Sequence, residues 1–248
     1  MDKDLQLFED NQRIKDIFIE KYNGSHPMAE AINHSILSNK IDYDFSGKSC
    51  AVIGSSPNIL KKKYGKEIDN HDFVIRSNAA RIEGFEDYVG SRTDFRVISG
   101  KTFSSIKFEN DGSPFPSATW FPRLKGEHFL VRPTPYDIDR VFSVYDLHMN
   151  GKNRISYVHK DVEKYASMLA GCIESTTGFM SVLISILLFK KVDIYGYSFY
   201  GGRTDIEFPS SKYYCMAPIP CGGQAHSFKG ELAATKQLET QGLLEWHT

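Results

Sequence analysis

The feature that most constrains the fold is an uncharged apolar segment that runs almost directly into a second apolar segment. The first, residues 177–189, reads TGFMSVLISILLF, and the second, residues 192–199, reads VDIYGYSF. The first is apolar nearly all round and is followed by Lys190 and Lys191, which is typical of a buried helix with a cationic C-terminus. It is too short to cross a bilayer, which needs about 20 residues. A buried helix over 177–191 followed by a buried strand predicts an αβ unit.

Other short apolar segments, each followed by turn-forming or polar residues, predict further strands. They are residues 49–54, 72–78, 95–99, 128–132 and 155–159. Their alternation with helical segments predicts an α/β fold whose sheet is mostly parallel and flanked by helices. In such a sheet, ligands bind at the carboxyl ends of the strands.

The remaining segments are expected to complete a single domain over residues 1–248. Residues 1–45 form a predicted helical extension, which begins with an amphipathic helix over 3–22 and either packs on the domain or binds a partner. Residues 101–126 carry several Pro, Gly and Ser and predict an irregular insertion near a site. A final helix is predicted over residues 228–245.

Charge and cysteine content exclude several classes of protein. With 30 Lys+Arg against 31 Asp+Glu, the net charge of −1 argues against a general nucleic-acid or membrane-surface binder. The four cysteines are Cys50, Cys172, Cys215 and Cys221, and no CxxC pair is present, which argues against a zinc ribbon or a thioredoxin-like site. Whether Cys215 and Cys221 pair is left open.

Two loops resemble anion-binding sites in their residue types. The sequence GSSPN after the strand at 49–54 is either an ordinary βα turn or a phosphate-binding loop, because small residues let backbone N–H groups approach an anion. The sequence STTG, Ser175 to Gly178, opens the apolar helix. It is either a simple helix cap or, with three hydroxyls at a positive helix end, a cradle for a phosphate or carboxylate.

A histidine near the C-terminus is a candidate base. His226 lies in QAHSFKGE, five residues before Glu231. A lone histidine is more often a surface or hydrogen-bonded structural residue, and the same holds for His71 in DNHDF. The pair Tyr213–Tyr214 is likewise compatible with a half-buried edge strand.

Four segments, taken in chain order, resemble the sialylmotifs of the animal-type sialyltransferases, glycosyltransferase family 29. Residues 50–99 resemble the large sialylmotif through the blocks CAV, YGKEID, HDFVIRSN and GFEDYVGSRT. Residues 175–197 resemble the small motif, and KYYC at 212–215 is similar to motif three. HSFKGE at 226–231 resembles the very small motif, a His and a Glu separated by four residues. Residues 1–45 and 100–170 lie outside the resemblance.

This resemblance implies an activity and a fold. Members of the family transfer sialic acid from CMP-sialic acid to a hydroxyl of a glycan acceptor, with inversion at the anomeric carbon. Their fold is a single Rossmann-like domain, a variant of the GT-A type, and no metal is needed for catalysis. A single phosphate can be held by a helix start and hydroxyls, which agrees with the absence of a convincing DxD pair. Residues 100–170 are expected to shape the acceptor site.

The resemblance also implies roles for individual residues. His226 is implied to be the general base, with Ser175 and Glu231 in supporting roles. The implied donor-binding residues are Ser55, Asn58, Asn78, Ser99, Thr176, Thr177, Gly178, Lys212 and Tyr213.

Three positions depart from the family pattern. Ser55 stands where some members have Asn, and Lys212 stands where motif three often has His. Lys190 stands where the family has the cysteine that pairs with the one in the large motif, so Cys50 is expected to be a free thiol.

The missing cysteine and the lack of an N-terminal anchor in this sequence predict a cytoplasmic protein of bacterial or viral type. The alternative is the trimmed luminal domain of a Golgi enzyme, which does not explain Lys190.

Three other functions remain as alternatives. The donor can be another CMP-ulosonic acid such as CMP-Kdo, because both donors share CMP and an anomeric carboxylate. The chain can also be a non-catalytic relative that binds a CMP-sugar or a glycan. A dinucleotide-dependent oxidoreductase is disfavoured, because no GxGxxG follows the first strand.

Overall fold

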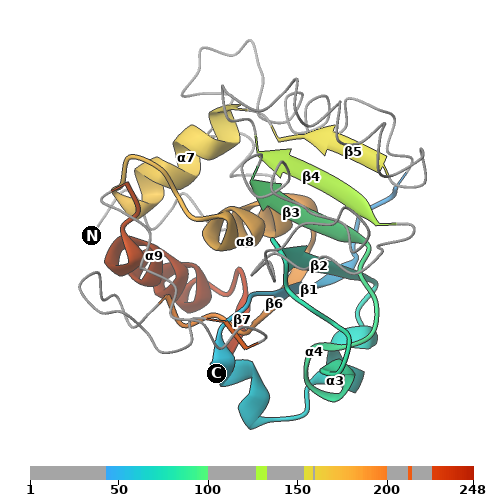
Figure 1. The fold of residues 1–248 in the computed structure, drawn as a ribbon. Helices are drawn as coiled ribbons and strands as arrows, with labels where there is room; N and C mark the ends of the chain where they lie inside the picture. The colour runs from blue at the N-terminus through green and yellow to red at the C-terminus, as the bar shows by residue number, and fades with distance from the viewer. Residues whose placement is uncertain (1–42, 100–126, 133–153, 159, 200–211, 214–224) are drawn as a thin grey trace, which may run out of the picture.

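The structure is a computed structural model and describes residues 43–99, 127–132, 154–158, 160–199, 212–213 and 225–248 (Figure 1). The expected helices within residues 1–42, the insertion at 101–126, Cys215 and Cys221 lie outside these residues.

The described residues build one seven-stranded sheet in which each pairing of neighbouring strands is parallel. The strand order is β5-β4-β3-β2-β1-β6-β7. The strands are β1 (Ser49–Ile53), β2 (Phe73–Ser77), β3 (Phe95–Ser99), β4 (His128–Arg132), β5 (Arg154–Tyr157), β6 (Lys191–Tyr195) and β7 (Glu245–His247). The α/β fold with a parallel sheet is thereby confirmed.

Helices cover both faces of this sheet (Figure 1). One face carries α7 (Lys160–Ala170), α8 (Thr177–Leu188) and α9 (Phe228–Thr240). The other face carries the 3-10 helix η2 (Pro57–Lys61) and the short helices α3 (Gly65–Asp69) and α4 (Glu86–Val89). Among the described residues, none of the helices combines the length and the apolar character that a membrane crossing requires.

Helix α8 lies at the centre of the larger core. Phe179, Met180, Leu183 and Ile184 of this helix are fully buried, and each such side chain contributes roughly 1.5–3 kcal/mol by leaving water. Because the core surrounds α8 on most sides, the helix is apolar around nearly its whole circumference.

A chain of buried hydroxyl groups connects β6, β2 and α8. Ser181 Oγ donates to the carbonyl oxygen of Thr177 at 2.8 Å, and Ser77 Oγ donates to Ser181 Oγ at 2.9 Å. Tyr197 OH lies 3.0 Å from Ser77 Oγ. Because a carbonyl can only accept, each hydroxyl has one direction of donation, and Tyr197 must donate to Ser77. Burial of Tyr197 raises the pKa of its phenol, so it stays protonated as this chain requires.

The prediction for the last helix was wrong at its C-terminal end. Helix α9 ends at Thr240, and residues 245–247 form the edge strand β7 instead of a last helical turn. Gly242 has a φ of 71°, a left-handed conformation that ends a helix and redirects the chain.

Cys50 is a buried free thiol in β1, as the sequence predicts. Burial raises the pKa of this thiol well above its usual value, so it remains neutral. Lys190, at the family position of the partner cysteine, follows α8 and is exposed.

Candidate functional site

The strand order changes direction at β1, which lies between β2 and β6. Two glycines follow these strands, Gly54 after β1 and Gly196 after β6. A Cβ atom on Gly54 would lie 2.4 Å from the carbonyl oxygen of Gly196, so the two backbones approach as closely as glycine allows. The carboxyl ends of β1 and β6 therefore lie together at the topological switch point. Open α/β sheets bind their ligands at this point.

The loop after β1 brings two of the predicted residues to this point. The carbonyl oxygen of Ser55 accepts from Tyr213 N at 2.9 Å. Asn58 Nδ2 donates to the carbonyl oxygen of Tyr197 at 3.2 Å, which leaves Asn58 Oδ1 buried without a partner among the described residues. Because the Tyr197 carbonyl can only accept, the amide orientation is fixed, and an unused acceptor remains for a ligand donor.

Asn78 and Ser99 lie together at the carboxyl ends of β2 and β3. Ser99 N donates to Asn78 Oδ1 at 3.4 Å. Asn78 has a φ of 49°, a left-handed conformation that asparagine tolerates better than most residues. Arg96 Nη1 donates to the carbonyl oxygen of Asn78 at 2.6 Å and so supports this conformation.

The start of α8 is a capped helix end. Thr176 is the N-cap and its Oγ1 accepts from Phe179 N at 3.1 Å. Ser175 Oγ is buried and has no partner among the described groups. The N–H groups of Thr177 and Gly178, in the first turn, have no acceptor within the helix. The capping interpretation of STTG is confirmed, and the anion cradle stays a prediction that rests on Ser175, Thr177 and Gly178.

Glu231, in the first turn of α9, binds this helix start. Its Oε1 accepts from Thr176 N at 2.6 Å and its Oε2 accepts from Thr176 Oγ1 at 2.7 Å. The side chain is fully buried, and burial raises its pKa, although the two bonds from Thr176 act in the opposite direction. Glu231 thus accepts both hydrogen bonds that the backbone N–H and the hydroxyl of Thr176 donate.

His226 lies beside the same segment. Its Nδ1 is 2.7 Å from the carbonyl oxygen of Glu174, two residues before the N-cap, and Glu174 N donates to the carbonyl oxygen of Ala225. Because a carbonyl can only accept, Nδ1 carries the proton, and in the neutral ring Nε2 has the free lone pair. This bond fixes the orientation of the ring.

Arg132 was not singled out from the sequence, yet the structure brings it to the start of α8. Its guanidinium is 2% exposed, donates to Thr177 Oγ1 at 3.2 Å and pairs with Glu163 and Glu174. Arg132 Nε is buried without a hydrogen-bond partner among the described residues. The signal in the sequence is a cation at the end of an otherwise apolar strand, HFLVR.

Tyr213 and Lys212 differ in their surroundings. Tyr213 is buried on the face of η2 and α3, where its hydroxyl donates to the carbonyl oxygen of Arg81. Burial raises the pKa of Tyr213 to about 12, although Arg76 and Arg96 act in the opposite direction. Its hydroxyl can reach a phosphate only if the bond to Arg81 breaks. Lys212 is half-buried beside it.

Replacing Glu231 by alanine is expected to destabilise the chain by about 2 kcal/mol, because it leaves the partly buried Thr176 N and Oγ1 without their acceptors. Glu231→Gln keeps one acceptor for Thr176 N and is expected to cost less. Urea unfolding measures both, with Lys236→Ala on the exposed side of α9 as the control. Equal midpoints for Glu231→Ala and Lys236→Ala would contradict this role.

The protein belongs to the Rossmann-like class of α/β proteins. Its parallel sheet and the switch point between the carboxyl ends of β1 and β6 define this class. A solved structure of the same fold is described as the crystal structure of a mammalian sialyltransferase. It matches with a TM-score of 0.58 and 20% identity over 100% of this chain and 86% of that chain.

Sequence comparisons all find similarity to sialyltransferases. Residues 4–122 match the family model described as glycosyltransferase family 29 (sialyltransferase). A relative named sialyltransferase-like protein 2 from Arabidopsis thaliana is 29% identical over 80% of this chain and 39% of its own length. The CMP-N-acetylneuraminate-beta-galactosamide-alpha-2,3-sialyltransferase 1 of Sus scrofa is 31% identical over 61% of this chain and 44% of its own length. By these comparisons the chain resembles the sialyltransferases of glycosyltransferase family 29.

The chain spans about two fifths of the length of these curated relatives. The family match over residues 4–122 also extends into segments 1–45 and 100–170, which the motif comparison had left outside the resemblance.

Proposed function

We propose that the protein transfers sialic acid from CMP-sialic acid to a hydroxyl of a glycan acceptor, with inversion, on a GT-A-type variant of the Rossmann-like fold. The observation that carries this proposal is the position of His226. Its Nδ1 is held by the Glu174 carbonyl, two residues before the N-cap of α8. His226 is a base with a free lone pair, and the start of α8 suits a phosphate. The short segment from Glu174 to Thr176 thus joins the two.

The donor side of the proposal uses the carboxyl ends of the strands. The phosphate of CMP would lie at the first turn of α8, near the N–H groups of Thr177 and Gly178, where the helix dipole favours a negative charge. Asn58 Oδ1 offers an unused acceptor to a donor group of the nucleoside. Ser55, Asn78 and Ser99 would complete the nucleotide side. Lys212 would lie near the phosphate.

The transfer step follows from this arrangement. His226 Nε2 takes the proton of the acceptor hydroxyl as its oxygen forms a bond to the anomeric carbon. The bond from that carbon to the phosphate oxygen breaks on the opposite face, so the configuration inverts and CMP leaves with the bonding electron pair. The start of α8 and Lys212 would stabilise the charge that develops on the phosphate.

The test of this function is direct. The full chain is incubated with CMP-Neu5Ac or CMP-Kdo and a panel of galactosides, and released CMP and the glycoside product are measured together. We expect release of CMP with CMP-Neu5Ac to be matched by product. Activity confined to CMP-Kdo would assign the alternative donor. CMP binding without release from either donor would identify a non-catalytic CMP-sugar-binding relative.

Transfer is expected to persist in EDTA, because the donor phosphate is held by backbone N–H groups and Lys212. The measurement is the initial rate at low temperature, with and without EDTA, followed by addition of Mg²⁺ or Mn²⁺. A rate that vanishes in EDTA and returns only with one of these two ions would contradict the phosphate site.

The compartment is also part of the proposal. A reducing, cytoplasmic environment is supported by the free thiol of Cys50 and by Lys190 at the family position of its partner.

A further inference from the structure

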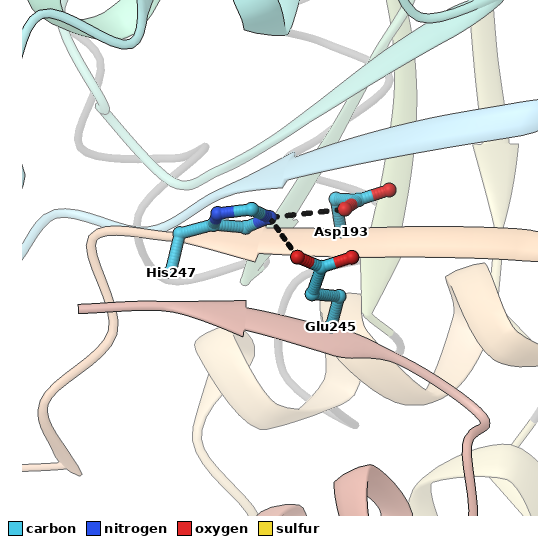
Figure 2. Close-up of side chains that lie close together, drawn as sticks. All are labelled: Asp193, Glu245 and His247. Atoms are coloured by element: carbon cyan, nitrogen blue, oxygen red, sulfur yellow. Dashed lines mark hydrogen bonds and ion pairs between the residues drawn. The ribbon is translucent and has the colours of Figure 1, made fainter.

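A second polar cluster lies on the other face of the sheet from α8. Asp193 in β6 is paired in register with Glu245 in the edge strand β7, and Tyr195 is paired with His247. Residues two apart in a strand share a face, so all four side chains lie on the side of Ala51 and α3. Figure 2 shows the His247 ring directed at the carboxylates of Asp193 and Glu245.

Three ligand atoms of this cluster converge. His247 Nε2 is 3.0 Å from Asp193 Oδ1 and 3.8 Å from Glu245 Oε1, and the three atoms all lie within 4.8 Å of one another. A tetrahedral zinc ion with ligands at about 2.0–2.2 Å separates them by roughly 3.3 Å. These two distances lie on either side of that value, and the two carboxylate oxygens are at most 4.8 Å apart, so a movement of the exposed Glu245 side chain would seat an ion.

The ligand types select the class of metal. One imidazole nitrogen with two carboxylates suits Zn²⁺, whereas Ca²⁺ and Mg²⁺ prefer sites made of oxygen alone. Three protein ligands leave the fourth position to a water molecule.

Two of the ligands, Asp193 and His247, are also contacted by other side chains. The second oxygen of Asp193 lies 3.0 Å from His71 Nε2. His247 stacks on Tyr195 at 4.3 Å, and its Nδ1 lies 3.6 Å from Glu67 Oε1, which accepts from Tyr195 OH. A carboxylate behind a ligating histidine is the arrangement that orients such ligands in metal sites.

One cation competes for the same carboxylate. Lys191 Nζ lies 3.5 Å from Asp193 Oδ2, the oxygen that faces away from His247, and its side chain is largely exposed. It neutralises Asp193 without occupying the position between the three ligand atoms.

We propose that Asp193, Glu245 and His247 bind one Zn²⁺ ion that fastens β7 to β6. The opposite face of β7 gives this site a structural consequence. Trp246 Nε1 donates to the carbonyl oxygen of Tyr197 at 3.3 Å, the same carbonyl to which Asn58 donates. An ion on one side of β7 therefore steadies a strand whose other side reaches the switch point.

Zinc binding is tested on the full chain after removal of metal with EDTA and dialysis. We expect about one equivalent of Zn²⁺ per chain by mass spectrometry after gel filtration. At a free Zn²⁺ concentration of about 100 Kd, the melting temperature is expected to rise by roughly 5 °C or more. Mg²⁺ is expected to have no such effect.

Variants locate the site. Glu245 is 67% exposed, so Glu245→Gln should fold, and we expect it to weaken zinc binding at least about tenfold. His247→Phe keeps the ring on Tyr195 but removes the nitrogen, and Glu86→Gln on α4 is the control for loss of an exposed carboxylate. Substitution of Co²⁺ gives a second readout, tetrahedral absorption bands that His247→Phe should abolish. No binding by the wild type, or binding that His247→Phe and Glu245→Gln leave unchanged, would overturn the proposal.

Discussion

Replacing His226 by alanine is expected to lower the rate of sialyl transfer by about 10²–10⁴-fold, the usual contribution of a general base. The free Nε2 of His226 would be the only atom of that residue to touch the acceptor, since Nδ1 is bonded to the carbonyl oxygen of Glu174. The loss should therefore fall on the chemical step. The measurement is kcat and KM for transfer to the best galactoside.

His226→Asn is the matched variant for this test. An asparagine amide can keep a hydrogen bond to the Glu174 carbonyl but cannot take a proton, so its rate should fall as far as that of the alanine variant. Protection against heat by CMP should persist in both variants, because the nucleotide side does not use His226. Transfer by His226→Asn at the wild-type rate would rule out the general base. A loss of CMP protection would assign His226 to donor binding instead.

Replacing Glu127 by alanine is expected to reduce the free energy of unfolding by about 3–5 kcal/mol, because Arg96 would remain buried without its counter-ion. Arg96 Nε and Nη2 lie 2.6 and 2.8 Å from the two oxygens of Glu127, and both side chains are buried. Arg96 also supports the left-handed turn at Asn78. CMP affinity is therefore expected to fall as well, beyond what the loss of stability explains.

Urea unfolding and CMP titration measure these two effects. Asp87→Ala is the matched control, because it removes a carboxylate from the exposed pair with Lys63, whose Nζ is 2.7 Å from Asp87 Oδ2. The control should leave the midpoint unchanged. Equal midpoints for Glu127→Ala and Asp87→Ala would contradict the importance of the buried pair. An unchanged CMP affinity would show that Arg96 does not influence the donor site.

Much of the central sheet was predictable from the sequence. The predicted strands at 95–99 and 128–132 agree with β3 and β4 to the residue, and the start of α8 at Thr177 is also as predicted. Buried parallel strands are short apolar segments with polar ends, and their limits are therefore visible in the sequence. Strand β7 was missed because Glu245–His247 has little strand character alone and depends on pairing with β6.

The site was predictable in its residues more than in its contacts. The resemblance singled out Thr176, His226 and Glu231, and the structure brings them close, since Glu231 accepts from Thr176 and His226 bonds to the carbonyl oxygen of Glu174. Nothing in the pattern HSFKGE shows that Glu231 accepts from Thr176, the N-cap of α8, since that contact joins residues far apart in the sequence. Arg132 was missed because its contact with Thr177 also joins residues far apart in the sequence.

The buried hydroxyl chain has a consequence for the orientation of α8. A helix that is apolar on nearly every side can rotate about its axis with little change in the apolar area it buries, so hydrophobic packing alone leaves its rotation poorly determined. The bond from Ser77 Oγ in β2 to Ser181 Oγ favours one rotation, because it is the link in this hydroxyl chain that joins the helix to the sheet. The direction in which the first-turn N–H groups point is thus set deep in the core, by side chains that never meet a ligand.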